Sequence, residues 1–164
     1  GNFSELLAYQ AWVGAQHRIY DEDIRPDYNG VIFRAALQYD RTELSRYILK
    51  ADRTPEESTF DGQSYYVKNS AELSWRRQIR ERIYWNSVGT VDYNEYSRIT
   101  KRASTSEDET RRDLVFQAGT GLEYRLPNDI MSFVLDYKFT GRASNLDGLD
   151  YEDNAVSVGV RAYY

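Results

Sequence analysis

The chain has no cysteine, a single histidine, three prolines, and no apolar run that approaches the length of a membrane-spanning helix. The lack of cysteine excludes a disulfide framework and a thiolate metal site. Because a transmembrane helix needs about 20 consecutive apolar residues, this chain can cross a membrane only as strands. The net charge of -5 argues against a nucleic-acid partner, which would require a basic surface. The length suits one domain over residues 1–164.

Alternation of apolar and polar residues with a period of two recurs in eight stretches, whereas helical periodicity is poor. In the first stretch Leu7, Tyr9 and Val13 share one face, and Gln10 and Arg18 lie on the other. The eight stretches cover residues 7–18, 31–39, 46–51, 65–76, 83–93, 114–125, 131–139 and 156–164. Each apolar face is about four to six positions long, which matches the roughly 9 to 11 residues of a tilted strand that crosses a bilayer.

The connections between these stretches alternate between short and long. Tight turns are predicted at Asp40 to Thr42, Arg77 to Arg80 and Pro127 to Asp129. The long polar connections are predicted at Asp21 to Asp27, Asp52 to Gly62, Ser97 to Asp113 and Arg142 to Asp153. Outer-membrane barrels have short periplasmic turns and long extracellular loops. The pattern therefore predicts an all-β fold, a transmembrane antiparallel up-and-down barrel of eight strands with both termini in the periplasm of a bacterial outer membrane.

Alternation alone does not say which face points inward, and a soluble lipocalin-like barrel would place the apolar residues inside, around a lipid. Large aromatic residues at the ends of the apolar faces favour the inverted arrangement, because such residues gather at bilayer interfaces. The predicted aromatic girdle consists of Tyr39, Trp75, Trp85, Tyr124 and Tyr164. Outer-membrane lipid and lipopolysaccharide are then the expected surroundings.

The polar faces carry charges of both signs, which predicts a charge network in the lumen. Its members are Arg34, Lys68, Glu72, Arg76, Glu123, Arg125, Asp136, Lys138 and Arg161. Because eight strands enclose a space just wide enough for their own side chains, this interpretation favours a packed ionic plug over an open conduit. The excess of arginine and lysine would instead attract an anionic solute if additional strands or subunits widened the pore.

The last three stretches carry motifs of a known family. Gly119, Gly121, Leu122, Tyr124 and Leu126 are followed by Tyr137, Arg142, Ser144 and Asn145, then by Tyr151, Asn154 and the Val156-Ser157-Val158 alternation. From about Arg111 to Tyr164 the chain resembles the putative β-barrel porin type 2 family, which is associated with exopolysaccharide systems. Members of that family are longer, so the resemblance leaves open a small relative or the C-terminal part of a larger barrel. The strand from Ala155 to Tyr164 also resembles the C-terminal recognition strand of outer-membrane proteins, which implies the barrel-assembly machinery as a partner.

The sequence offers no convincing enzyme site, cofactor motif or metal motif. His17 lies beside the acidic residues Asp21 to Asp23, as in rim-sited outer-membrane hydrolases, but no nucleophile motif accompanies it. The expected function is a non-catalytic outer-membrane structural or assembly component, linked through the resemblance to exopolysaccharide export and its envelope proteins. The alternatives are a narrow porin or the pore-forming half of a larger barrel, a lipid-modifying hydrolase, and a soluble lipid binder.

Overall fold

The computed structural model describes residues 2–4, 6–19, 27–58, 65–101, 108–127 and 130–162, and it is built from antiparallel strands in one sheet. The strands are β1 (Asn2–Ser4), β2 (Leu7–Arg18), β3 (Tyr28–Thr42), β4 (Ser45–Glu57), β5 (Tyr65–Arg80), β6 (Ile83–Lys101), β7 (Asp108–Arg125), β8 (Met131–Ser144) and β9 (Tyr151–Ala162). Each strand pairs with its neighbours in the chain, which confirms the up-and-down arrangement of the eight long strands. Within the described part of the chain, no helix is long and apolar enough to cross a membrane.

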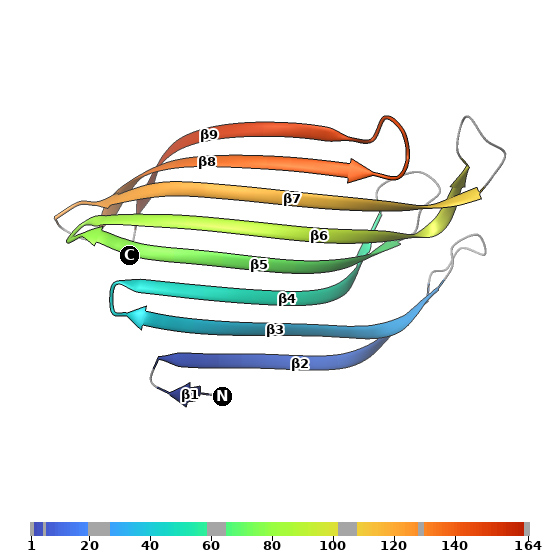
Figure 1. The fold of residues 1–164 in the computed structure, drawn as a ribbon, viewed down its shortest axis with the longest axis horizontal. Coiled ribbons are helices and arrows are strands. Elements are labelled where there is room, and N and C mark those ends of the chain that lie inside the picture. Colours follow the sequence, from blue (N-terminus) through green and yellow to red (C-terminus); the bar gives the residue numbers. More distant parts are fainter. Residues whose placement is uncertain are drawn as a thin grey trace.

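The connections lie at the two ends of the strands, as Figure 1 shows. The end with the short turns is here called the turn edge, and the end with the longer connections is called the loop edge. At the turn edge β3 joins β4 and β5 joins β6 through two residues each, Glu43 and Leu44 in the first hairpin and Glu81 and Arg82 in the second. At the loop edge the connections span residues 19–27, 58–64, 102–107 and 145–150. The described ends, β1 and the last residues of β9, both lie at the turn edge.

Several predicted boundaries were wrong because the strands are longer than the apolar alternation suggested. Asp40 to Thr42 belongs to β3 and Arg77 to Arg80 belongs to β5, so both turns lie further along the chain. At the loop edge the strands extend well into the connections predicted at Asp52 to Gly62 and Ser97 to Asp113. β8 and β9 likewise enter the predicted Arg142 to Asp153 connection. Apolar alternation marks only strand that meets an apolar environment, whereas ladder hydrogen bonds continue through polar residues on both faces.

Two further differences concern the ends of the sheet. The three residues of β1, which the pattern did not reveal, pair with the start of β2. The predicted barrel would be closed, but among the described strands β9 pairs only with β8 and the sheet is open. The curvature of an eight-stranded sheet is set by stagger and side-chain packing, which no single strand's sequence encodes. Two other predicted connections lie partly outside the described residues. These are the turn after Pro127, at Asn128 and Asp129, and the first long connection, at residues 21–26.

Candidate functional site

The cross-strand register sorts the side chains onto two faces. On the apolar face one row runs from Val13 to Phe33 and on to Arg53 of β4. A second row on the same face runs from Leu122 to Leu135 and on to Val158. The apolar side chains of this face are exposed, at 54% for Leu73, 49% for Leu135 and 79% for Val158. The other face, here called the polar face, carries all nine residues of the predicted charge network.

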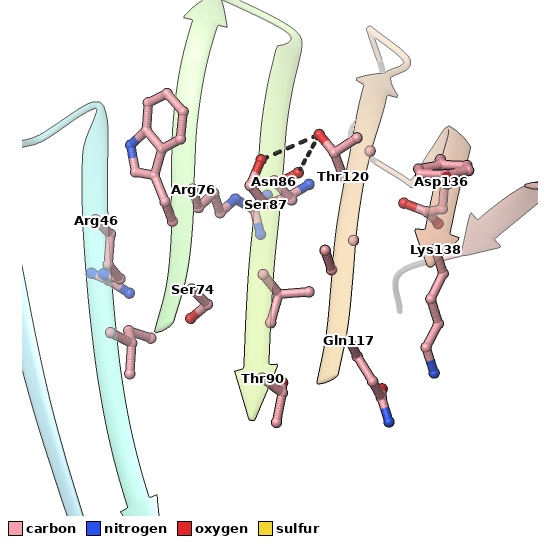
Figure 2. Close-up of a pocket in the computed structure, with 17 residues that line it drawn as sticks. Arg46, Ser74, Arg76, Asn86, Ser87, Thr90, Gln117, Thr120, Asp136 and Lys138 are labelled. Carbon is pink, nitrogen blue, oxygen red and sulfur yellow. Dashed lines mark hydrogen bonds between the residues drawn. The ribbon is translucent and has the colours of Figure 1, made fainter. Parts of the chain in front are cut away.

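Hollows lie on the polar face and, beside Leu73 and Leu122, on the apolar face as well. A cavity of about 500 Å³ lies over β4 to β8, where Figure 2 shows Arg46, Arg76 and Lys138 coming from three different strands around it. Gly119 and Gly121 of β7 line it. A Cβ atom at Gly121 would overlap the carboxylate of Asp136 and lie 3.0 Å from the Leu135 carbonyl oxygen. The missing side chains therefore allow Asp136 to pack directly over the backbone of β7.

Glu123 holds the centre of an arginine cluster near the turn edge, here called the Glu123 cluster (Arg76, Tyr84, Glu123, Arg125 and Arg161). Arg76 Nη2 donates to Glu123 Oε2 at 3.1 Å, and Arg125 Nε donates to Glu123 Oε1 at 2.9 Å. Arg161 Nη1 lies 3.7 Å from Glu123 Oε2. The guanidinium carbons of Arg76 and Arg125 lie 4.8 and 4.6 Å from the centre of the Tyr84 ring, within the range of cation–π attraction. Strands β5, β6, β7 and β9 thus all contribute to one cluster.

Two smaller ion pairs occupy the middle of the polar face. Lys50 Nζ lies 2.8 Å from Glu72 Oε1, and Lys68 Nζ lies 3.2 Å from Asp92 Oδ2. Ser70 Oγ also donates to Asp92 Oδ1 at 2.5 Å. Both pairs join adjacent strands, because the register places Lys50 opposite Glu72 and brings Lys68 diagonal to Asp92.

A further cluster near the loop edge was missed by the sequence analysis, and it is here called the Asp113 cluster. Asp113 is fully buried, and Arg111, 2% exposed, donates to both of its carboxylate oxygens. Ser144 Oγ donates to Asp113 at 2.7 Å, and the Tyr96 hydroxyl does so at 3.3 Å. The spacing of Arg111 and Asp113, two residues apart and hence on one face of a strand, was the available signal. The prediction of a loop at Ser97 to Asp113 concealed it.

The other members of the predicted charge network belong to separate groups in the described part of the chain. Glu72 pairs with Lys50, not with its neighbours Lys68 and Arg76. Within the described part of the chain, Arg34, Asp136 and Lys138 form no ion pair, and the last two line the hollow of Figure 2. The charges are thus divided among separate groups with open space between them.

Four aromatic side chains form a row on the apolar face near the turn edge. The ring centres of Tyr39 and Tyr47 are 6.3 Å apart, those of Tyr47 and Trp75 are 6.0 Å apart, and those of Trp75 and Trp85 are 5.8 Å apart. Tyr47 was not among the predicted girdle residues. Tyr124 lies on the same face, opposite Phe133, and Tyr164 lies outside the described residues. Whether this row meets a bilayer interface stays a prediction.

His17 lies on the apolar face opposite Asn29, at the loop edge. Among the described residues its side chain forms no hydrogen bond, and the acidic residues Asp21 to Asp23 lie outside them. Within the same ranges, no three His, Asp or Glu side chains are grouped so that they could hold a metal ion.

Membrane β-barrels combine sequential antiparallel strands with an exposed apolar face and a polar face on the other side. Residues 2–164 match the model of a family described as putative beta-barrel porin 2. The chain belongs to this family. The match to the putative beta-barrel porin 2 family covers the upstream strands as well as the last three, which carry the motifs of the resemblance.

Membership of the putative beta-barrel porin 2 family implies an outer-membrane location and a porin type of protein rather than a class of enzyme. No curated protein and no solved structure matches the chain. The soluble lipocalin-like alternative requires the apolar face to lie inside, but in the structure that face is exposed, and the fully buried side chains Asp113, Glu123 and Ser132 lie on the polar face.

Proposed function

We propose that the chain forms part of the wall of a water-filled β-barrel channel in the bacterial outer membrane, with its polar face toward the water. The apolar face then meets lipid, because an outward band of apolar side chains such as Leu73, Leu135 and Val158 is what barrels present to the bilayer. The turn edge is the periplasmic side in this proposal, because short turns occupy that side in outer-membrane barrels.

One observation carries the proposal: on the polar face charged side chains such as Arg46 and Arg76 border hollows, where a plug would have packed side chains. Besides the cavity of about 500 Å³ in Figure 2, a second cavity of about 640 Å³ lies at the turn edge and is lined by Arg46, Arg76 and Arg125 among others. Charged groups beside such spaces require water. A ring of only eight strands would be filled by its own side chains, so the proposed channel is wider than the described strands could enclose alone.

The outermost strands of the sheet, which are not paired with each other, lead to the same conclusion. In hydrocarbon every backbone amide and carbonyl group needs a hydrogen-bond partner within the protein. Among the strands that the structure describes, β9 has a neighbour on one side only, and its side chains from Tyr151 to Ala162 are all exposed. In the proposed channel further strands complete the ring at this edge and at the opposite one.

The absence of native cysteine makes a direct test available, because any introduced thiol is unique. Thr90 lines the hollow of the polar face and Val91, its neighbour, projects from the apolar face with 49% exposure. In lipid vesicles a water-soluble, membrane-impermeant thiol reagent is expected to label Thr90→Cys much faster than Val91→Cys. The reverse order would mean that the faces are assigned the wrong way round.

Conductance provides the second part of the test. Detergent-folded protein added to a planar bilayer is expected to produce stepwise currents, and the thiol reagent should reduce the current of the Thr90→Cys variant but not that of Val91→Cys. Protein that inserts and labels at Thr90→Cys without carrying current would refute the open channel in favour of a plugged barrel. The link to exopolysaccharide export and the roles of envelope proteins and assembly machinery stay predictions of the resemblance.

A further inference from the structure

A further candidate site lies on the apolar face near the turn edge, beside the tryptophans of β5 and β6. We infer that Arg77 and the adjacent apolar hollow bind one phospholipid whose head group carries a net negative charge. Arg77 binds the lipid phosphate in this arrangement, and the hollow holds an acyl chain. The inference rests on the proposed assignment of the apolar face to lipid, and it adds a specific lipid site to that face.

Arg77 brings a positive charge to the apolar face. The register places it opposite Ser45 of β4 and Trp85 of β6. It follows Trp75 by two residues, so both side chains lie on one face about 7 Å apart. Arg77 is exposed, and it forms no hydrogen bond or ion pair with any residue that the structure describes. Because its donors form a fixed fork that matches two oxygens of a phosphate, a lipid phosphate is a fitting partner.

The two tryptophans beside Arg77 are fixed by hydrogen bonds within the protein. Trp75 Nε1 donates to Ser45 Oγ at 3.1 Å, and Trp85 Nε1 donates to Thr120 Oγ1 at 2.7 Å. Their ring centres lie 5.8 Å apart. Since both indole donors are used, the rings offer a lipid only their apolar surfaces. Tryptophan side chains prefer the level of the lipid head groups, so Arg77 lies at the depth where a phosphate is expected.

A hollow opens on the apolar face next to Trp75. Its volume is about 500 Å³, and the side chains that line it include Tyr47, Leu73 and Ala118. Gly89 also lines it, and a Cβ atom added there would meet nothing within 4 Å. Leu73 and Gly89 are paired in the register and lie further from the turn edge than Trp75. The hollow therefore leads from the level of the tryptophans toward the middle of the apolar face, the path that an acyl chain would follow.

The charge of Arg77 decides which occupant is proposed. A second copy of this chain would bring an apolar face against the hollow, and it would bury the guanidinium group without a partner, which is costly. A phospholipid supplies a chain for the hollow and a phosphate for Arg77 in one molecule. A net negative head group is favoured, because basic residues at a membrane surface attract anionic lipids.

The test uses tryptophan fluorescence of the protein in phosphatidylcholine vesicles that contain lipids brominated on their acyl chains. Bromine quenches this fluorescence at short range, so quenching reports which lipid lies beside the indole rings. Trp12, on the polar face, is replaced by phenylalanine in every sample, which leaves Trp75 and Trp85 as the reporters. Brominated phosphatidylglycerol is compared with brominated phosphatidylcholine at equal mole fractions. We expect phosphatidylglycerol to be preferred about fivefold, the effect of one basic residue beside an anionic lipid.

Arg77→Gln tests the phosphate contact. This substitution should abolish the preference for phosphatidylglycerol. Arg112→Gln is the matched control, because Arg112 is an exposed arginine on the same face, opposite Glu95 at the loop edge, and it should keep the preference. A wild-type preference in Arg77→Gln would overturn the site.

Gly89→Leu tests the hollow, because the added side chain would occupy it. The readout is the fraction of detergent-extracted protein that carries one phosphatidylglycerol molecule in native mass spectrometry. We expect Gly89→Leu to lose this lipid. Val91→Leu, which enlarges a side chain of the same strand and face outside the hollow, should retain it. Ala118→Leu serves as a second filling variant, and folding is checked by strand content and by the heat-dependent electrophoretic shift. Lipid retained by either filled variant in its folded form would overturn the acyl-chain contact.

The outcomes separate the lipid site from the proposed orientation of the sheet. Equal quenching of the wild type by the two brominated lipids would overturn the site and leave the apolar face in lipid. No quenching by either lipid, in protein that has inserted, would refute the assignment of this face to lipid and the site with it. Quenching that falls as the protein-to-lipid ratio rises, together with cross-linked dimers, would show a second copy in the hollow and overturn the lipid site.

Discussion

Val158→Arg, compared with Ser157→Arg, is the sharpest test of the orientation of the sheet. The two residues are adjacent in β9, so both substitutions add the same side chain to the same strand, but on opposite faces. Both positions are exposed, with Val158 at 79%, so neither arginine meets a packed protein core. The comparison therefore isolates the solvent that each face meets.

The expected magnitude follows from the position of Val158. It lies at the centre of the apolar run Val156, Val158 and Val160, and its neighbour across the ladder is Leu135. An arginine on the lipid face near the bilayer midplane costs roughly 2 to 4 kcal/mol. Because about 1.4 kcal/mol corresponds to a tenfold change in an equilibrium constant, the folding equilibrium should fall roughly 30- to 700-fold.

The assay is reversible denaturant unfolding of the protein in phospholipid vesicles, followed by tryptophan fluorescence. Val158→Arg should lower the free energy of unfolding by the amount above, and Ser157→Arg should change it by less than about 1 kcal/mol, as for ordinary exposed substitutions. Equal effects of the two variants, or a larger loss in Ser157→Arg, would refute the assignment of the apolar face to lipid.

Three further outcomes are expected in the same unfolding assay. Glu123→Leu should destabilise the protein by about 1 to 3 kcal/mol. The loss is smaller than for a fully buried ion pair because the arginine partners of Glu123 are partly exposed. An unchanged free energy of unfolding would mean that the cluster contributes nothing to stability. Gly121→Ala should cost about 1 to 3 kcal/mol, because the added Cβ would overlap Asp136. Gly89→Ala should be neutral or stabilising, because a Cβ there meets open space. Similar free energies for the two variants would contradict the close packing over β7. A double-mutant cycle with Arg111→Gln and Asp113→Asn should give a coupling of about 1 to 3 kcal/mol, and additive losses would show that the buried pair is not coupled.

The sequence was sufficient to predict the faces of the strands. Leu7, Tyr9 and Val13 of β2, and Phe133, Leu135 and Tyr137 of β8, all lie on the face that their alternation predicted. Side chains of a strand alternate strictly between two faces, so one polar residue in register fixes the orientation of the whole stretch. The number of long strands and their sequential pairing also followed, because short connections force neighbouring strands together.

Strand ends and charge partners needed the tertiary structure. Arg111 and Asp113 were placed in a loop because no apolar alternation marks that part of β7, although the ladder continues through it. In its own strand Glu72 has Lys68 and Arg76 on the same face, and only the register of β4 against β5 selects Lys50 as its partner. The contact of Arg76 with Glu123 joins residues separated by an intervening strand, so it depends on the curvature of the sheet as well as on register.

What the sequence by itself determined is therefore local: which residues extend as strands, which face each side chain occupies, and that one face is apolar over a length suited to a bilayer. What only the tertiary structure decided is the hollow beside Gly119 and Gly121, the three arginines around Glu123, and the open edges of the sheet. The physical reason is that alternation is a property of one strand, whereas curvature, stagger and ion pairing depend on how several strands pack together.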